Sequence, residues 1–155
     1  MTERLAENAV KKSKGYELLE HKADVLFEAS GASFEQTLEA AAQALFDTTA
    51  KTAKLKGEKK IKISQTASSL EELVVFTLGA LLSESDANEL FFKEFKVTEF
   101  KKTENGFTIK GEACGEAETP ALGGTLVKAV TFGELRVAKP TGKNKKWKIR
   151  VLLDV

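Results

Sequence analysis

The sequence predicts an α+β fold in which two amphipathic helices pack on a mainly antiparallel sheet. Its 155 residues favour a single domain. Two segments repeat apolar residues at helical spacing, and the other regular segments alternate apolar and polar residues as strands do. These strand segments follow one another in pairs instead of alternating with helices, which favours antiparallel pairing. Residues 1–14 are polar and rich in lysine, so we expect a flexible basic extension before a domain spanning residues 15–155.

The first half of that domain begins with two predicted strands, Tyr16–Glu20 and Asp24–Ser30, joined by a short polar connection that contains His21. A helix should follow, because Ser33 and Gln36 have the spacing of a capping box, in which each side chain binds a free backbone N–H of the first turn. The apolar stripe of this helix comprises Phe34, Leu38, Ala41, Ala42, Leu45 and Phe46.

A third strand and a second helix are predicted next. In Glu58–Gln65, isoleucines alternate with lysines, which is typical of a strand with one buried face. Ser68 and Glu71 repeat the capping-box spacing and should begin the helix. Its apolar stripe comprises Leu70, Leu73, Val74, Leu78, Leu81 and Leu82.

The last third of the chain is rich in strand signals. The predicted strands are Phe91–Thr103, Phe107–Ala117, Thr125–Lys139 and Lys146–Val155. Asn105-Gly106 predicts a two-residue hairpin turn in which both residues have positive φ. Pro120 and the Gly123-Gly124 pair place a loop between the second and third of these strands.

Composition excludes several classes of protein and leaves others open. Lys and Arg number 24 against 23 Asp and Glu, so net charge does not point to a polyanionic partner. The single cysteine, the lack of a signal-peptide pattern in residues 1–14 and the short longest apolar run, Leu73–Leu82, favour a cytoplasmic protein without a membrane span. The lysine-rich segments Lys51–Lys62 and Lys139–Arg150 either contact phosphate or form solvated strand edges, and no direct nucleic-acid specificity is expected.

Three places in the sequence hold candidate functional groups, and each of them also has a purely structural explanation. The Glu20–Asp24 connection combines carboxylate, imidazole and ammonium groups that could bind a metal or exchange protons, or form a solvated turn. Asp154 stands beside the α-carboxylate of Val155, and these two groups repel each other unless a hard cation or water screens them. Asp47 places a negative charge near the end of the first helix, where it interacts unfavourably with the helix dipole. It is either a functional group or an ordinary residue of a frayed helix end.

Four segments together resemble the archease family. Tyr16–Asp24 is similar to the opening of the family consensus, and Ala44–Asp47 to the end of its first helix. Val127–Phe132 resembles a Val-Lys-Ala-Val-Thr-Tyr strand, and Val151–Val155 resembles the family's abrupt C-terminus. The segments occur in the family order and span Tyr16 to Val155.

The resemblance implies a divalent-cation site, for Ca²⁺ or Mg²⁺, formed by Asp24, Asp154 and the chain-terminal Val155. It implies a partner-facing or supporting role for His21 and Asp47. It further implies a non-enzymatic activator of the GTP-dependent RNA ligase of tRNA splicing and RNA repair, with the ligase protein as partner. The alternatives are a chaperone or modulator of an RNA-modifying enzyme such as a tRNA methyltransferase and, third, a hydrolase that uses His21 with Asp24.

Overall fold

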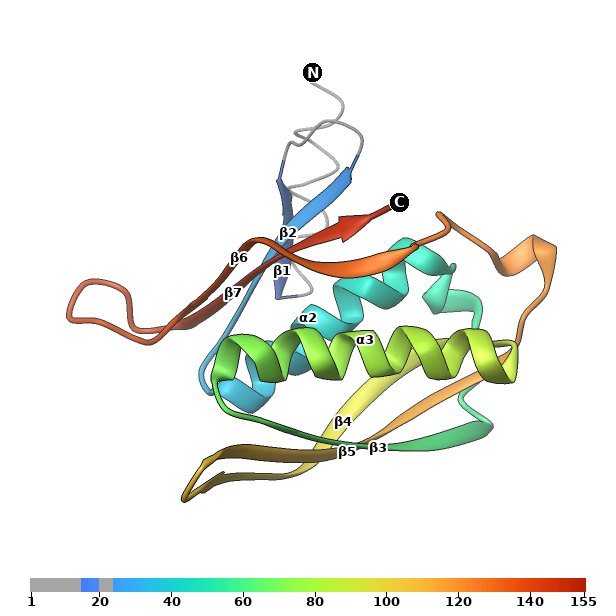
Figure 1. Ribbon diagram of the computed structural model, residues 1–155. Coiled ribbons are helices and arrows are strands. Elements are labelled where there is room, and N and C mark those ends of the chain that lie inside the picture. The colour runs from blue at the N-terminus through green and yellow to red at the C-terminus, as the bar shows by residue number, and fades with distance from the viewer. Residues whose placement is uncertain (1–14, 20–23) are drawn as a thin grey trace.

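The computed structural model describes residues 15–19 and 24–155 and confirms the α+β class (Figure 1). The predicted N-terminal extension and the connection that carries His21 lie outside the described residues. Within the described part of the chain, no helix combines the length and the apolar character needed to cross a membrane.

The order of elements agrees with the sequence-based one, with boundaries displaced by a few residues. The strands are β1 (Tyr16–Leu19), β2 (Asp24–Gly31), β3 (Lys59–Ala67), β4 (Leu90–Thr103), β5 (Gly106–Ala117), β6 (Ala129–Ala138) and β7 (Trp147–Asp154). The α-helices are α2 (Phe34–Thr49) and α3 (Leu70–Asn88), and the short 3₁₀ turns are η1 (Thr52–Lys54) and η2 (Pro120–Leu122).

The strands form two sheets instead of the one sheet expected. A four-stranded sheet has the order β1-β2-β7-β6, a three-stranded sheet has the order β3-β5-β4, and all pairings are antiparallel. Helix α2 contacts β2 and β7 of the first sheet and β4 of the second, and α3 contacts β6 as well as β3, β4 and β5. The helices therefore lie between the sheets (Figure 1).

Both helices begin at serine caps, one of them a residue later than predicted. The Ser33 hydroxyl accepts from the Gln36 N–H at 3.1 Å, which confirms the first cap. The cap of α3 is Ser69, which accepts from the Glu72 N–H at 3.1 Å, while Ser68 donates to the Glu72 side chain. Starting at Ser69 makes Leu70 the first helical residue and buries it.

The buried surface of α3 is wider than its predicted stripe. Val75 and Thr77, which lie outside that stripe, are also buried, because the helix is covered by strands of both sheets. Phe76 is 39% exposed and marks the outward-facing part of the helix. A single apolar cluster joins the two helices to the inner faces of both sheets.

Two predicted turns differ in detail. The β4–β5 hairpin pairs Thr103 with Gly106, so Glu104 and Asn105 form its loop, and only Gly106 has a positive φ, of 150°. The prediction that Asn105 also has positive φ is wrong. An alanine methyl at Gly106 would lie 2.2 Å from a backbone carbonyl oxygen, so close approach of two chain segments also requires glycine here.

Strand β6 starts at Ala129, four residues later than predicted. The preceding residues bind the end of α2 instead of the sheet: the N–H groups of Gly124 and Thr125 donate to the carbonyl oxygens of Thr49 and Thr48, both at 2.8 Å. A register shift follows inside β6, where Thr131 pairs with Leu152 but Arg136 already pairs with Arg150. The intervening bulge, residues 132–135, includes Glu134 with φ of 56°.

Candidate functional site

The acidic residues predicted for the cation site meet at one end of the four-stranded sheet. Asp24 is the first residue of β2, Asp154 is the last residue of β7, and the two are direct partners in the antiparallel register. Directly opposed residues project from the same face of a sheet, with Cβ atoms about 4.5–5.5 Å apart. The register therefore places the two side chains on one face of neighbouring strands.

The alternation along β7 explains why Asp154 faces outward. Ile149, Val151 and Leu153 are fully buried against the helices, so the residues between them point away from the core. Asp154 is accordingly exposed, and Asp24 is half-buried.

The backbone around Asp154 is held from a third strand. The Lys128 N–H donates to the Asp154 carbonyl oxygen at 2.7 Å, and Ala129 of β6 pairs with Asp154. Val155 follows directly and is half-buried. This anchoring fixes the backbone direction at the end of β7, so the position of the Asp154 side chain relative to β2 is also constrained.

The two aspartates supply the type of ligand atom that hard divalent cations prefer, but not a complete set of ligands. Carboxylate oxygens are the ligands that Ca²⁺ and Mg²⁺ prefer, and two opposed carboxylates repel each other in the absence of a cation. Across residues 15–19 and 24–155 there is no cluster of three or more His, Cys, Asp or Glu side chains suited to a metal. The side chains of Asp24 and Asp154 would therefore need a further ligand. His21 lies outside the described residues.

Asp47 occupies a different place, in a hydrogen-bonded junction. Its Oδ2 accepts from the Tyr16 hydroxyl at 2.8 Å, and its Oδ1 accepts from Gln43 Nε2 at 2.9 Å and from Thr52 Oγ1 at 2.5 Å. These donors belong to β1, α2 and η1, so the carboxylate joins three elements. The donors also offset its unfavourable position near the C-terminal end of α2.

Tyr16 is 2% exposed, and its hydroxyl points into this junction. Burial raises the pKa of Tyr16 well above its ordinary value, and the hydrogen bond to Asp47 and the negative charge of that carboxylate raise it further. The Tyr16 hydroxyl therefore stays protonated and donates a hydrogen bond to Asp47 at any physiological pH.

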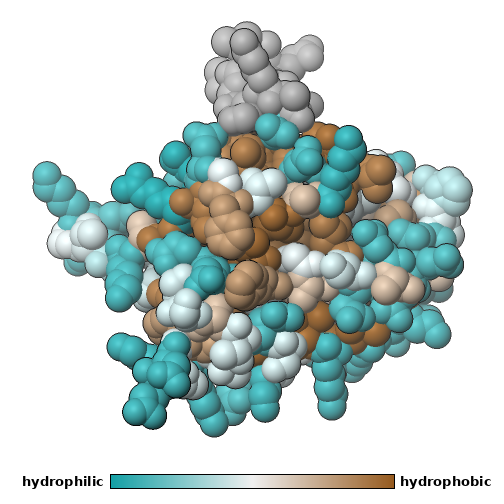
Figure 2. Space-filling model, viewed as in Figure 1, coloured by the Kyte–Doolittle hydropathy of each residue, from teal (hydrophilic) through white to brown (hydrophobic). Residues whose placement is uncertain are grey.

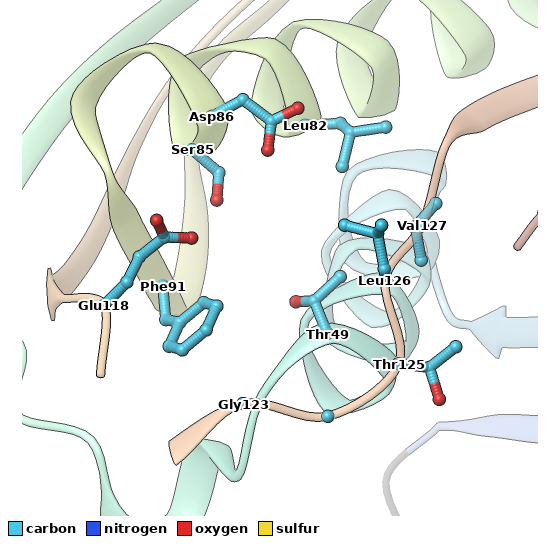
Figure 3. Close-up of a pocket in the computed structure, with 11 residues that line it drawn as sticks. Thr49, Leu82, Ser85, Asp86, Phe91, Glu118, Gly123, Thr125, Leu126 and Val127 are labelled. Carbon is cyan, nitrogen blue, oxygen red and sulfur yellow. The ribbon is translucent and has the colours of Figure 1, made fainter. Parts of the chain in front are cut away.

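A pocket of 180 Å³ opens between the C-terminal end of α3 and residues 118–127 (Figure 3). Leu82, Phe91 and Val127 provide apolar walls, and Leu126 stands at its rim 75% exposed. The segment that carries Leu126 is anchored by backbone hydrogen bonds to the end of α2. The same segment leads into Lys128, whose N–H binds Asp154, so the pocket and the acidic end of the sheet are neighbours along the chain.

One rim of this pocket is acidic. Asp86 and Glu118 line it, and Figure 3 shows their carboxylates on the side opposite Leu126. Burial raises the pKa of Glu118, and the nearby charges of Asp86 and Glu89 raise it further. Sequence reasoning missed this pocket, because its walls come from segments far apart in the chain.

Comparison with known proteins identifies the family. The model of the Archease protein family matches residues 16–155. Protein archease of Methanosarcina mazei is 37% identical over 144 residues, which cover 92% of this chain and 97% of that protein. Protein archease of Sulfolobus acidocaldarius is 32% identical over 142 residues, which cover 90% and 98%.

A solved structure agrees with these relatives. The solution structure of protein 1598 of Methanobacterium thermoautotrophicum is 28% identical, with a TM-score of 0.77, and the match covers 92% of this chain and 99% of that one. Sequence and fold thus coincide over nearly the whole length: the chain belongs to the archease family.

Proposed function

We propose that this protein is a non-enzymatic activator of a GTP-dependent RNA ligase in tRNA splicing and RNA repair, acting in the cytoplasm with a divalent cation bound at the end of the four-stranded sheet. The observation that carries the proposal is the direct pairing of Asp24 with Asp154 on neighbouring strands. Asp24 and Asp154 lie far apart in the sequence, and their adjacent positions in the register of β2 and β7 support this proposal.

Asp24, Asp154 and the carboxylate of Val155 would hold the Ca²⁺ or Mg²⁺ ion. A divalent cation supplies charge neutralisation at phosphate groups during nucleotidyl transfer. The protein's own contribution is positional, because β2 and β7 hold the two aspartates at a sheet end that projects from the helices (Figure 1). His21 and Asp47 would support this end or the partner contact, as the family resemblance implies.

Exposed apolar side chains support a protein partner. Phe76 on α3, Phe132 in the β6 bulge and Leu126 at the pocket rim are the large apolar residues exposed in the described chain. Figure 2 shows an apolar area on the face formed by α3 and β6. Exposed apolar areas of this kind commonly mark protein contact sites.

The test combines the pure protein with its cognate GTP-dependent RNA ligase, GTP and RNA with ligatable ends. If the protein activates the ligase, substoichiometric amounts of it should increase the rate of multiple-turnover ligation. Asp24→Asn and Asp154→Asn should each reduce the stimulation and weaken Ca²⁺ binding in a calorimetric titration. Glu104→Gln removes an equal charge in the β4–β5 turn and serves as the control.

His21→Ala extends the test to the connection between β1 and β2, and should lower stimulation while leaving the thermal transition in place. Unchanged ligation and equal Ca²⁺ affinity in wild type and both aspartate variants would refute the proposal. Suppressed aggregation of an RNA-modifying enzyme such as a tRNA methyltransferase, without ligase stimulation, would favour the chaperone or modulator alternative instead.

A further inference from the structure

The β6–β7 hairpin concentrates the positive charge of the molecule. Residues 136–150 contain seven basic residues and no acidic ones. The basic residues are Arg136, Lys139, Lys143, Lys145, Lys146, Lys148 and Arg150. Because the whole chain has a net charge of +1 with its histidine neutral, the rest of the chain carries a net charge of −6. The hairpin projects from the body of the molecule (Figure 1), and hydrophilic side chains cover the projection (Figure 2).

The β6 bulge determines which way this charge faces. Without a register shift, the pairing of Thr131 with Leu152 would place Arg136 opposite Trp147, on the face that packs against the helices. The observed register instead pairs Arg136 with Arg150, a shift of three residues. An odd shift reverses the faces, so the bulge turns Arg136 to the outer face of the sheet beside Arg150.

Two arginines directly opposite each other repel, and the described residues only partly neutralise them. Glu28 of β2 pairs with Arg150 at 3.2 Å and with Lys148 at 3.6 Å, so one carboxylate serves two cations. Within residues 15–19 and 24–155, Arg136 and Lys139 form no ion pair. A like-charged cross-strand pair costs stability unless an anion lies between its members, and the arrangement therefore favours an external polyanion.

These side chains line a cleft of 390 Å³ on the outer face of the sheet, which Thr141 and Asn144 of the hairpin loop complete. The loop is ordered by reciprocal hydrogen bonds: the Thr141 N–H donates to the Asn144 carbonyl oxygen at 2.5 Å, and the Asn144 N–H donates to Thr141 Oγ1 at 3.0 Å. Within residues 136–150 the one aromatic residue is Trp147, which packs inward against Phe34, with ring centroids 5.7 Å apart. The cleft lining thus combines four basic side chains with the Glu28 carboxylate, the Thr141 hydroxyl and the Asn144 amide, and it holds no ring for base stacking.

We propose that the outer face of the β6–β7 hairpin binds the phosphodiester backbone of RNA, without sequence specificity. Arg136 and Lys139 line the cleft, and Lys143 is exposed in the adjoining loop, so these three would contact phosphates, while Glu28 pairs with Arg150 and Lys148. The inference rests on the proposed function for the choice of RNA over another polyanion, and its test needs no ligase. It adds the RNA substrate itself as a second ligand of the protein, on a hairpin separate from the acidic sheet end.

The experiment measures binding of a fluorescent 20-nucleotide single-stranded RNA by anisotropy between 50 and 200 mM salt, with the full-length protein. The test variant replaces Arg136, Lys139 and Lys143 with glutamine. The control variant replaces Lys54, Lys56 and Lys59 with glutamine; these exposed lysines belong to the other lysine-rich segment, and the control changes the net charge equally. Circular dichroism confirms that both variants remain folded.

Wild type should bind with log Kd rising linearly with log salt, and a second RNA of different sequence should bind equally well. Each lost phosphate contact lowers the slope by about 0.7, so the test variant should lose about 2 units of slope and at least about tenfold in affinity at 100 mM salt, while the control stays near wild type. Equal losses in both variants, or no wild-type binding at 50 mM salt, would overturn the proposal. Displacement of RNA by an equimolar 20-residue polyglutamate would assign the cleft to acidic proteins instead. A ligase assay that fails while RNA still binds would count only against the activator function.

Discussion

Removal of the Tyr16 hydroxyl tests whether the Asp47 junction holds three elements together. Tyr16→Phe keeps the buried ring, including its edge contact with Phe27 at a centroid separation of 6.3 Å, and deletes only the donor to Asp47. No cavity is created beyond one oxygen atom, so the change isolates a hydrogen bond to a carboxylate. Such bonds contribute about 1.5–3 kcal/mol to the free energy of unfolding. We expect a loss of about 2 kcal/mol.

The assay is urea unfolding followed by circular dichroism. For a domain of this size, a loss of about 2 kcal/mol corresponds to a melting temperature lower by about 4–8 °C. The urea midpoint should fall while the slope of the transition stays the same, because the exposed surface does not change. An unchanged midpoint would show that the hydroxyl contributes nothing and that the junction is not structural.

The stabilities of wild type and Tyr16→Phe should also depend differently on pH. Because the folded-state pKa of Tyr16 lies above its ordinary value of 10.0, the folded protein keeps this proton where the unfolded chain loses it. The contribution of the Tyr16 hydroxyl to the free energy of unfolding is therefore complete below pH 10 and declines above pH 10. The difference in stability between wild type and Tyr16→Phe should shrink as pH rises above 10. A difference that is constant from pH 8 to pH 11 would contradict the role of burial and Asp47 in raising that pKa.

Three further predictions concern a helix cap, the acidic pocket rim and a turn. Ser69→Ala should lower the free energy of unfolding by about 1 kcal/mol in urea titration, whereas Ser68→Ala should cost less, because only Ser69 caps α3. Glu118→Gln should raise the melting temperature at pH 7, because the folded state disfavours ionised Glu118, and calorimetric scans should show the gain vanishing as pH falls below 4.5. Gly106→Ala should destabilise by more than about 1 kcal/mol, since it combines positive φ with a backbone clash, while Gly142→Ala, with open space around it, should leave the urea midpoint within experimental error.

The helices were predictable because their signals are local. Ser33 predicts the start of α2 to the residue, and the apolar stripe after it covers the helix up to Phe46, three residues before its end. At α3, two successive serines each have a glutamate three residues later, so sequence spacing alone does not choose between Ser68 and Ser69. The burial of Leu70 in the core favours Ser69 as the N-cap, and this burial is a tertiary effect.

The division into two sheets could not be predicted from strand patterns, because alternation identifies a strand but not its neighbours. A signal was present in α3, whose apolar residues extend past one stripe to Val75, which is buried. A helix that is apolar over most of its surface is expected to be covered on more than one side. The structure shows this covering, with one sheet on each side of the helices (Figure 1).

The candidate site was predictable only in part. Chemistry alone left Asp24 and Asp154 as possible solvated strand ends, and the family resemblance joined them; the register between β2 and β7 then showed how they meet. The opposition of Arg136 and Arg150 depends on the bulge of residues 132–135. A regular alternation would have placed Arg136 on the inner face, and no sequence rule predicts a three-residue shift.

The open borders of the two sheets limit how another protein can attach. Among the described strands, β1 is four residues long, β6 is interrupted by its bulge, β4 has two register shifts, and β3 presents exposed Lys60 and Lys62. Each of these features discourages an added strand from an extended peptide or from a second molecule. Main-chain pairing with a partner is therefore disfavoured, which leaves the side chains of the faces and strand ends for recognition. Sequence changes there would redirect the protein to another partner without altering the scaffold.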